Sequence, residues 1–307
     1  MLGHQERTAM KLGFVGLGNM GRYMATNVAK AGHELTVNDL RREAADPVIE
    51  AGASWADSPV AVARGAEAVL MSLPGPKDVE EVVTAANGVL AGMSEGSTII
   101  DLSTNSPSMV RKLRDLAAER NVGFLDAPVS GGTRGAREAT LAVMVGGRAE
   151  LFSQFEPMLK AIGPNVFHTG DVGTGNVAKL INNQLAFINI LAMEEALLMG
   201  AKAGMDLQLL RDIVQASSGD SFAWKGGAIA VLKDRLPPRF TTTLACKDIG
   251  LAQDLAKETE VATPFGTVAH QLLEHYKANG YAEEDVIATI RAAEEQAGIV
   301  IRGTWHD

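Results

Sequence analysis

The chain has 307 residues, 46% of them hydrophobic, and a formal net charge of −9 at pH 7. This length and apolar content are sufficient for two domains with buried cores. The acidic balance offers no basic field to a phosphate backbone, so we expect no nucleic-acid partner. The single cysteine, Cys246, excludes an internal disulfide framework and fits a reducing compartment. We expect it to be a packing residue rather than a nucleophile.

Further classes are disfavoured by the distribution of residues. No apolar run reaches the roughly 20 uncharged residues that a membrane span requires. Residues 1–10 lack the hydrophobic core of a signal peptide and are interpreted as a loose extension. We therefore expect a cytoplasmic protein without membrane association. The histidines are scattered, and the five-residue spacing of His270 and His275 does not place both on one helix face, so no metal site is predicted.

A glycine-rich turn follows the first apolar strand, Lys11 to Val15, and leads into a helix from Asn19 to Ala31. The turn has the pattern G-x-G-x-x-G and consists of Gly16, Leu17, Gly18, Asn19, Met20 and Gly21. The first glycine permits the tight turn, the second lets a pyrophosphate approach the backbone, and the third lets helix and strand pack closely. A purely structural turn is the alternative.

The second strand, Glu34 to Asn38, favours a dinucleotide site because it is followed by Asp39, 21 residues after Gly18. An acid there accepts hydrogen bonds from the adenosine ribose. A carboxylate also repels a 2′-phosphate, which predicts NAD as the cofactor. Arg41 and Arg42 follow at once, and either is placed to reach a 2′-phosphate, so NADP is the alternative. The alternative for both arginines is a solvated turn without a role in cofactor binding.

Strands and helices alternate through the first half of the chain. Further strands are predicted at 68–73, 98–103, 123–126, 141–145 and 166–169, and helices near 59–64, 77–85, 106–120 and 149–162. This alternation predicts an α/β domain of Rossmann type with a mostly parallel sheet. Ligands bind beyond the carboxyl ends of such strands, which makes Leu73, Pro74 and Thr104 candidate cofactor contacts. Thr104 alternatively caps the following helix.

Another strand end is followed by Ser130, Gly131 and Gly132. A hydroxyl and the exposed N–H groups of two glycines suit a carboxylate. A flexible loop is the alternative. Strand signals stop after Asp171, and helices are predicted from Gly173 to about Ala203 and then at 207–216, 222–232, 244–259, 264–278 and 283–302. We therefore expect a dinucleotide-binding domain at 11–172 and an all-helical domain at 173–307, with the long helix between them.

The long helix carries one polar cluster on a largely apolar surface. Lys179, Asn182 and Asn183 share a face, and Asn176 lies one turn earlier. Helices that are apolar on most sides are normally buried, and burial lowers the pKa of a lysine. A lysine that snorkels to water or pairs with Glu194 or Glu195 is the alternative. Lys247 is predicted in the first turn of a later helix, where it either bonds Asp248 or faces an anionic ligand.

Four segments together resemble the β-hydroxyacid dehydrogenases, which include 3-hydroxyisobutyrate dehydrogenase and tartronate semialdehyde reductase. They are GFVGLGNMG at 13–21, DAPVSGG at 126–132, GNVAKLINN at 175–183 and KDIGLA at 247–252. Their order and spacing fit from about Lys11 to Ile301. The resemblance implies reversible hydride transfer between NAD, or NADP, and a small 3-hydroxy acid. It also implies a homodimer or homotetramer in which the long helix packs between subunits.

The same resemblance assigns roles to individual residues. Lys179 is the catalytic lysine, and Asn183 assists at the substrate. The substrate carboxylate is held by Ser130, Gly131 and Gly132. The nucleotide is contacted by Leu73, Pro74 and Thr104, and Lys247 lines the cofactor and the active site.

Departures from related families narrow the expected reaction. The decarboxylating 6-phosphogluconate dehydrogenases have a histidine three residues and a glutamate seven residues after the lysine, where this chain has Asn182 and Ala186. We therefore expect oxidation or reduction without decarboxylation. An imine or ketone reductase of the same superfamily is one alternative, although imine reductases generally replace the lysine. A catalytically silent NAD-binding scaffold is another.

Overall fold

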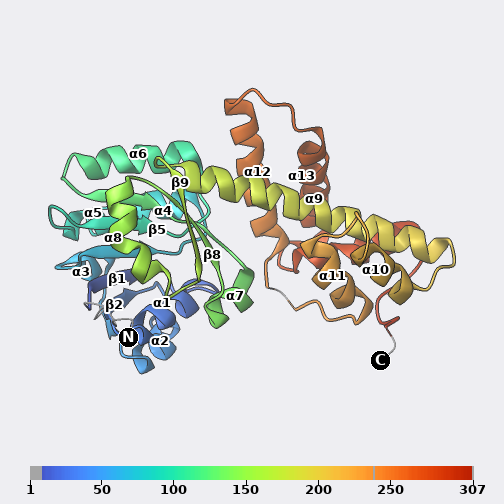
Figure 1. Cartoon of the computed structure of the whole chain (residues 1–307), viewed down its shortest axis with the longest axis horizontal. Coiled ribbons are helices and arrows are strands. Elements are labelled where there is room, and N and C mark those ends of the chain that lie inside the picture. Colours follow the sequence, from blue (N-terminus) through green and yellow to red (C-terminus); the bar gives the residue numbers. More distant parts are fainter. Residues whose placement is uncertain (1–8, 238, 306–307) are drawn as a thin grey trace, which may run out of the picture. The chain divides into compact units, whose positions relative to one another are not determined.

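The computed structural model describes residues 9–237 and 239–305. The chain divides into two compact units, one ending at Lys179 and the other beginning at Leu180, so the division falls inside α9 (Thr174–Lys202). The first unit is an α/β structure and the second is helical (Figure 1). The predicted fold class is confirmed.

The first unit is built on a nine-stranded sheet in the order β3-β2-β1-β4-β5-β6-β8-β7, with β9 paired to β8. Its strands are β1 (Lys11–Val15), β2 (Glu34–Asn38), β3 (Ser54–Trp55), β4 (Ala68–Met71), β5 (Thr98–Asp101), β6 (Gly123–Asp126), β7 (Val129–Ser130), β8 (Ala142–Gly146) and β9 (Asn165–Gly170). Pairing is parallel from β3 through β6, whereas β8 runs antiparallel to β6 and β7.

The ends of five strands lie in register along one edge of this sheet. Val15 pairs with Asn38 on one side and with Met71 on the other. Met71 pairs with Asp101, and Asp101 pairs with Asp126. Each of these residues is the last of its strand. The segments that follow β1, β2, β4, β5 and β6 therefore leave the sheet at one common edge.

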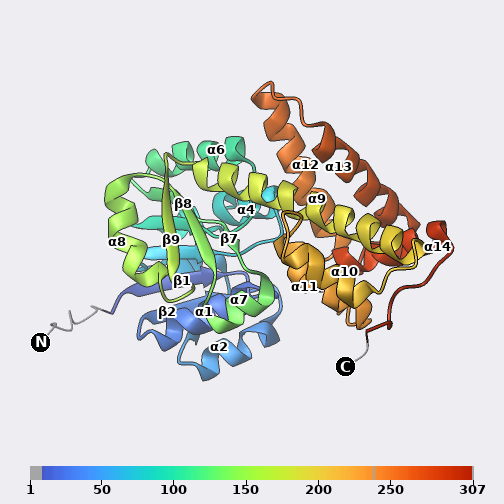
Figure 2. The same ribbon diagram turned by 45° about the vertical axis from the view of Figure 1, so that its right-hand side comes forward.

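Two apolar clusters cover the two faces of the sheet (Figures 1 and 2). On one face pack α1 (Gly21–Lys30), α2 (Asp46–Glu50), α7 (Gly132–Glu138) and α8 (Ala149–Leu159); on the other pack α3 (Pro59–Ala63), α4 (Pro76–Thr84), α5 (Val89–Gly92) and α6 (Pro107–Ala118). Adjacent side chains of β1 serve different faces, since Phe14 belongs to the first cluster and Val15 to the second. Parallel strands covered on both sides are apolar throughout, as β4 is.

The second unit packs its helices around the remainder of α9. They are α10 (Leu207–Gln215), α11 (Phe222–Leu232), α12 (Thr242–Glu258), α13 (Pro264–Tyr276) and α14 (Ile290–Ala297), with single turns η2 (Lys277–Tyr281) and η3 (Val286–Thr289) before α14. Phe187, Ile190 and Leu191 of α9 join one apolar cluster with α12 and α13, and Met193, Leu197 and Leu198 join a second with α11. α9 is the core helix of this unit.

The predicted last helix, 283–302, is wrong in extent. The turn η3 begins after Asp285, whose carboxylate accepts from the Ile287 N–H at 3.1 Å. The helix α14 ends at Ala297 and is followed by Gly298 in the left-handed region, with φ of 64°. Beyond it the chain turns back, because Glu294 Oε1 accepts from the N–H groups of Ile301 and Arg302 at 2.8 and 3.0 Å. The left-handed conformation of Gly298 and the hydrogen bonds to Glu294 therefore end the helix earlier than its apolar pattern predicts.

By length and composition α9 is the one helix among the described residues that is able to cross a membrane. The sequence has no run of about 20 uncharged residues because Lys179 and Glu194 interrupt the apolar stretch of α9. Phe187, Leu191 and Leu197 of α9 are at most 7% exposed and pack within the second unit. Burial in a folded core therefore explains part of the apolar character of α9, while Ile181, Leu185 and Met199 of the same helix are exposed.

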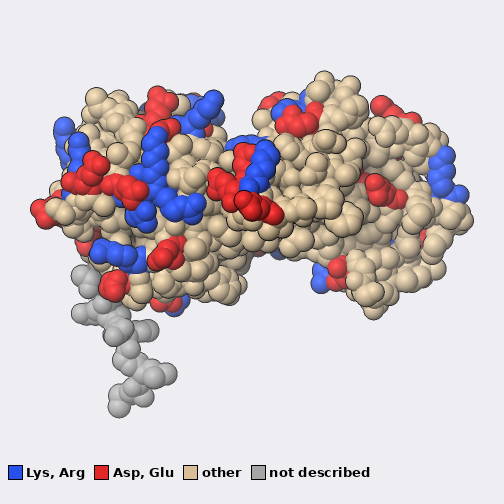
Figure 3. All heavy atoms as spheres, turned by 90° about the horizontal axis from the view of Figure 1, so that it is seen from above, with Lys and Arg blue, Asp and Glu red and all other residues tan. Residues whose placement is uncertain are grey.

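Charged side chains of both signs are intermingled on the face that Figure 3 draws, with wide uncharged areas between them. Pairs such as Arg42 with Asp46 at 3.0 Å and Lys160 with Glu156 at 2.7 Å join partly exposed side chains four residues apart. Such pairs contribute about 0.3–0.5 kcal/mol each. The stability of both units therefore depends chiefly on the buried apolar clusters.

One carboxyl group lies inside the second unit. Glu194 is 2% exposed, and Thr289 Oγ1 donates to its Oε1 at 2.8 Å. Burial raises the pKa of Glu194 well above its ordinary value, and the charges of Glu195 and Glu294 add to this effect. At a pH at which Glu194 would be ionised in water, a neutral side chain of the same shape should therefore give a more stable folded protein.

We predict that Glu194→Gln stabilises the protein more as the pH rises. Because the folded-state pKa is raised, the contribution of Glu194 to stability is complete below its unfolded pKa of about 4.5 and is lost as the pH rises through the folded-state value. Calorimetry at pH 5 and pH 8 should show a larger gain in Tm at pH 8. Glu258→Gln, at an exposed position of α12, is the control and should show little difference between the two pH values. A gain that shrinks with pH would contradict the assignment.

Candidate active site

The candidate cofactor residues all follow strand ends that are aligned in the sheet. Gly16 directly follows β1 and Asp39 directly follows β2, while Leu73 and Pro74 come just after β4 and Thr104 just after β5. The Gly16 N–H donates to the Asn38 carbonyl at 3.0 Å. The Leu73 N–H donates to Ser103 Oγ at 2.9 Å. The register of the sheet thus brings these segments to one edge.

The three glycines of the turn are required for different reasons. Gly16 has φ of +93°, and a Cβ there would lie 2.3 Å from the Ser72 carbonyl oxygen. A Cβ at Gly21 would lie 1.9 Å from the Gly16 oxygen. A Cβ at Gly18 would meet nothing within 4 Å. Folding explains the first and third glycines, and the open space at Gly18, before the N-terminus of α1, fits a pyrophosphate.

The residues between the glycines differ in burial. Leu17 is 1% exposed and belongs to an apolar cluster of the sheet. Asn19 is exposed and Met20 is half-buried at the start of α1. No side chain caps this helix, so the N–H groups of its first turn have no partner from a capping side chain. Because its side chain is buried, Leu17 can contact a nucleotide only through its backbone.

Asp39 is fixed against the glycine turn. Its Oδ2 accepts from the Leu17 N–H at 2.6 Å, and its Oδ1 accepts from the Arg41 N–H at 2.9 Å. Its side chain is 13% exposed. A carboxylate has about four lone-pair sites, so two bonds to the backbone leave capacity for ribose hydroxyls. Asp39 thus joins β2 to the turn and still fits a nucleoside.

The two arginines after Asp39 have different surroundings. Arg42 pairs with Asp46 at 3.0 Å and lies over the Trp55 ring, 4.8 Å from its centroid. Arg41 is 67% exposed, with its Nε 4.0 Å from Asp39 Oδ1. Two contacts hold Arg42, so Arg41 is the better placed of the two for a 2′-phosphate, and it lies beside a carboxylate.

The segment predicted to bind the substrate carboxylate is a strand and a helix rather than a flexible loop. Ser130 ends β7, and Gly131 and Gly132, with φ of +134° and +63°, lead into α7. The alternative role of Thr104 as a helix cap is wrong, because Ser106 Oγ caps α6 by accepting from the Met109 N–H at 3.1 Å.

The first turn of α9 is bound to the carboxyl ends of β5 and β6. Asp126 Oδ1 accepts from the Gly173 N–H at 2.7 Å, and Oδ2 accepts from the Asn176 N–H at 2.8 Å and from its Nδ2 at 3.2 Å. Asn176 Oδ1 accepts from the Asn105 N–H at 2.7 Å. Lys179, 9% exposed, follows Asn176 by three residues on the same helix.

The alternative pairing of Lys179 with Glu194 or Glu195 is excluded by distance. Fifteen residues of one continuous helix separate Lys179 from Glu194, roughly 22 Å along the axis. Glu194 is instead bonded to Thr289 within the second unit.

Asn183 and Lys247 meet at one acid within the second unit. Asn183 Nδ2 donates to Asp248 Oδ2 at 2.6 Å, and Lys247 Nζ lies 2.8 Å from Asp248 Oδ1. The predicted bond between Lys247 and Asp248 is confirmed. Its place in a first turn is wrong, because α12 begins at Thr242 behind the cap Thr241. The helix dipole therefore does not explain Lys247.

Sequence reasoning missed two buried acids. Asp101 and Asp126 are 0% exposed. Burial raises the pKa of Asp126, and it raises the pKa of Asp101 to about 6. The sequence holds a signal for both, since each is an acid that ends an otherwise apolar buried strand. Such a residue must find donors inside the protein.

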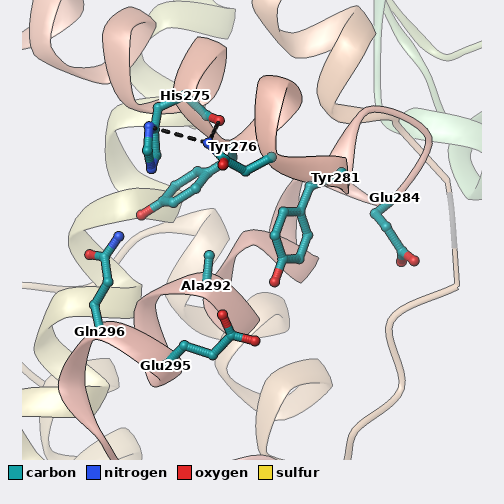
Figure 4. Close-up of a pocket in the computed structure, with 9 residues that line it drawn as sticks. His275, Tyr276, Tyr281, Glu284, Ala292, Glu295 and Gln296 are labelled. Atoms are coloured by element: carbon teal, nitrogen blue, oxygen red, sulfur yellow. Dashed lines mark hydrogen bonds between the residues drawn. The ribbon is translucent and has the colours of Figure 1, made fainter.

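Other reactive groups within residues 9–237 and 239–305 do not form a second centre. Cys246 is buried and burial raises its pKa to about 12, which confirms a packing residue. Among the described residues no three His, Cys, Asp or Glu side chains are grouped as metal ligands. A cavity of about 370 Å³ in the second unit is lined by Tyr276, Tyr281 and Glu295 among others, and contains none of the predicted site residues (Figure 4).

Two family models match the chain in succession. The model described as the NAD-binding domain of 6-phosphogluconate dehydrogenase matches residues 11–170. The model described as NAD-binding of NADP-dependent 3-hydroxyisobutyrate dehydrogenase matches residues 173–293. Both halves of the chain therefore match dehydrogenase families.

Individual relatives agree over most of the chain. It is 36% identical to 2-(hydroxymethyl)glutarate dehydrogenase of Eubacterium barkeri, over 96% of this chain and 98% of the relative. It is 39% identical to the NAD-dependent L-serine dehydrogenase of Pseudomonas aeruginosa, over 90% and 95%. The structure of Mycobacterium tuberculosis 3-hydroxyisobutyrate dehydrogenase with L-serine superimposes with a TM-score of 0.86 at 31% identity, covering 93% of this chain and 99% of that one. The chain belongs to the β-hydroxyacid dehydrogenase family and is an NAD(P)-dependent dehydrogenase.

Proposed function

We propose that this protein reversibly oxidises the primary alcohol of a small 3-hydroxy acid, HOCH2–CH(R)–COO−, to the aldehyde without decarboxylation. The observation that carries the proposal is the chemistry shared by the relatives. The substrates in the names 2-(hydroxymethyl)glutarate, L-serine and 3-hydroxyisobutyrate dehydrogenase all contain a hydroxymethyl group on the carbon that bears a carboxylate. They differ only in R. 3-Hydroxyisobutyrate and glycerate are our first candidates.

In this proposal Lys179 is the general acid and base. A nicotinamide held by the proposed cofactor residues would supply the hydride acceptor in oxidation and the hydride donor in reduction. Lys179 in its neutral form takes the hydroxyl proton in oxidation, and its ammonium returns the proton in reduction. Proton transfer of this kind contributes about 10²- to 10⁴-fold to the rate. Burial of Lys179 and its fixed first turn on α9 support the role.

The substrate carboxylate is proposed to bind at Ser130, Gly131 and Gly132, with Asn183 assisting. The positive φ angles of the two glycines favour glycine at both positions, and a Cβ at Gly132 would meet no other atom within 4 Å. Asn183 is held by Asp248, which fixes the orientation of its amide. The absence of an acid at Ala186 supports oxidation without decarboxylation.

NAD is the proposed physiological cofactor. Asp39 repels a 2′-phosphate, and the nearer arginine, Arg41, lies beside that same carboxylate. Leu73, Pro74, Thr104 and Lys247 complete the proposed cofactor contacts.

We predict that the protein binds NAD more tightly than NADP and that Asp39→Asn narrows the difference. Asparagine keeps an acceptor for the ribose but removes the negative charge that opposes a phosphate. Fluorescence quenching with both cofactors gives the two Kd values. Glu50→Gln, which removes one negative charge from an exposed position of α2, is the charge-matched control. Tighter binding of NADP by the unmodified protein would overturn the assignment and favour Arg41.

We also propose a cytoplasmic homodimer or homotetramer. Apolar side chains of the second unit support assembly, since Leu209 and Ile213 are exposed four residues apart on α10, and Phe265 and Val268 three apart on α13. Light scattering at micromolar concentration should therefore give a mass of two or four chains. A monomer mass would contradict this proposal.

The function is tested first on a panel of acids. 3-Hydroxyisobutyrate, glycerate, L-serine and 3-hydroxypropionate are offered with NAD, and each is compared with its methyl ester. We expect NADH formation from at least one acid, weaker turnover of its ester, and release of CO2 no faster than the spontaneous decarboxylation of the 3-oxo acid product. Equal turnover of ester and acid would contradict a carboxylate site and favour a ketone reductase.

On the best substrate of that panel, Lys179→Ala should lose about 10²- to 10⁴-fold in single-turnover NADH formation. The Kd for NAD should change little, because the proposed nucleotide residues lie mainly on the sheet edge. Thermal unfolding of the same preparation separates a catalytic loss from a folding defect. Lys202→Ala, at the other end of α9, is the control. A folded Lys179→Ala protein with a normal single-turnover rate would remove this lysine from the mechanism.

A further inference from the structure

Two carboxyl groups lie side by side in the interior of the first unit. Asp101 and Asp126 are paired residues on the adjacent strands β5 and β6, and both are 0% exposed. Two acids buried together oppose each other's ionisation, and burial alone already raises the pKa of each. Such a pair is stable only if donors surround it. The identity of those donors indicates what the pair does.

The donors to Asp126 come from the start of α9. They are the N–H of Gly173 and the N–H and Nδ2 of Asn176, at 2.7–3.2 Å. N–H groups at a helix start have no partner within the helix, and a carboxylate is favourable near its positive end. Asp126 comes about 50 residues earlier in the chain. A side chain from the sheet therefore fastens the beginning of the helix that carries Lys179.

The backbone around Asp126 leaves room for this carboxylate. A Cβ at Gly146 would lie 2.4 Å from Asp126 Oδ1. A Cβ at Gly175 would lie 2.9 Å from Asp126 Oδ2 and 2.3 Å from the Met144 carbonyl oxygen. Real Cβ atoms essentially never approach other heavy atoms this closely. Both segments can therefore pass the carboxylate at these positions only as glycine.

Asn105 connects this anchor to the nucleotide side of the sheet edge. Its N–H donates to Asn176 Oδ1 at 2.7 Å, and its Nδ2 donates to Asp101 Oδ2 at 3.2 Å. Asp101 Oδ1 accepts from the Ser103 N–H at 3.0 Å, and Ser103 Oγ accepts from the Leu73 N–H at 2.9 Å. A continuous set of hydrogen bonds thus runs from the segment after β4 to the first turn of α9.

We propose that Asp126 is a positioning residue, which holds the first turn of α9 and thereby Lys179, and that Asn105 and Asp101 tie this turn to the proposed nucleotide segments. The inference rests on the proposed role of Lys179. Its physical reason is that proton transfer demands an accurate placement of the amine, and a displacement of about 1 Å can cost about 10²-fold in rate. Asp126 touches neither substrate nor cofactor in this proposal.

The test is Asp126→Asn, which keeps the shape of the side chain but turns an NH2 group toward N–H donors. We expect single-turnover NADH formation to fall about 10- to 100-fold, with Kd for NAD and KM for the acid within about twofold. Hydrogen exchange in residues 173–179 should accelerate in the cofactor-free protein. Asp206→Asn is the matched control, because Asp206 caps α10 by accepting from the Leu209 N–H at 2.8 Å. It should keep its cap through the amide Oδ1 and keep the rate.

The outcomes separate a positioning role from a structural one. Asp126→Asn with faster exchange at 173–179 and a normal single-turnover rate per folded molecule would overturn the proposal. If this variant does not fold, Asn176→Ala replaces it, since it keeps Asp126 and the backbone donors but removes the links to Nδ2 and to Asn105. An unchanged rate in that variant would equally overturn it.

The same experiments distinguish this inference from the proposed function. No NADH formation from any acid of the panel would reject the proposed function, whereas a normal rate in Lys179→Ala would remove this lysine from the mechanism and with it the positioning role. An inactive Lys179→Ala beside a normal, folded Asp126→Asn would leave the function standing and reject only the positioning role.

Discussion

The register of the parallel strands is the constraint on which the rest of the site depends. Four neighbouring strands, β1, β4, β5 and β6, end at the same level of the sheet. Their last residues pair in turn, Val15 with Met71, Met71 with Asp101 and Asp101 with Asp126. A slip of one residue would turn the buried faces of a strand toward the wrong cluster. It would also displace the loop that follows this strand relative to the loops of the neighbouring strands. The packing of two apolar clusters thus determines both the fold and the alignment of the nucleotide segments.

Much of this could be predicted from local pattern. Apolar runs bounded by glycine or polar residues identified seven strands of the sheet, and a glycine-rich segment followed by a long apolar run identified the long helix within one residue at each end. The turn at Gly16 and the acid Asp39 were recognisable because their spacing reflects a single local unit of strand, turn, helix and strand. The two-residue strand β3 and the single-turn helix α5 were missed, because so few residues do not establish a strand or helix period.

Contacts between distant segments could not be predicted in the same way. Nothing near Asp126 in the sequence indicates that its partners are Gly173 and Asn176, and nothing near Lys247 reveals that Asp248 also holds Asn183. Helix ends set by such contacts were misjudged for the same reason, as at Glu294. Lys179 can be recognised as a candidate base from the sequence of its own helix. The contacts that orient this helix are visible only in the folded sheet.

The three glycines of the first turn also carry a historical consequence. Gly16 and Gly21 have no room for a side chain whether or not a nucleotide is ever bound, while Gly18 faces open space. Selection for folding alone would therefore preserve the outer two and release the middle one. In a descendant of this protein that had turned to another task, drift at the middle position would be the earliest mark in the sequence that the nucleotide had been given up.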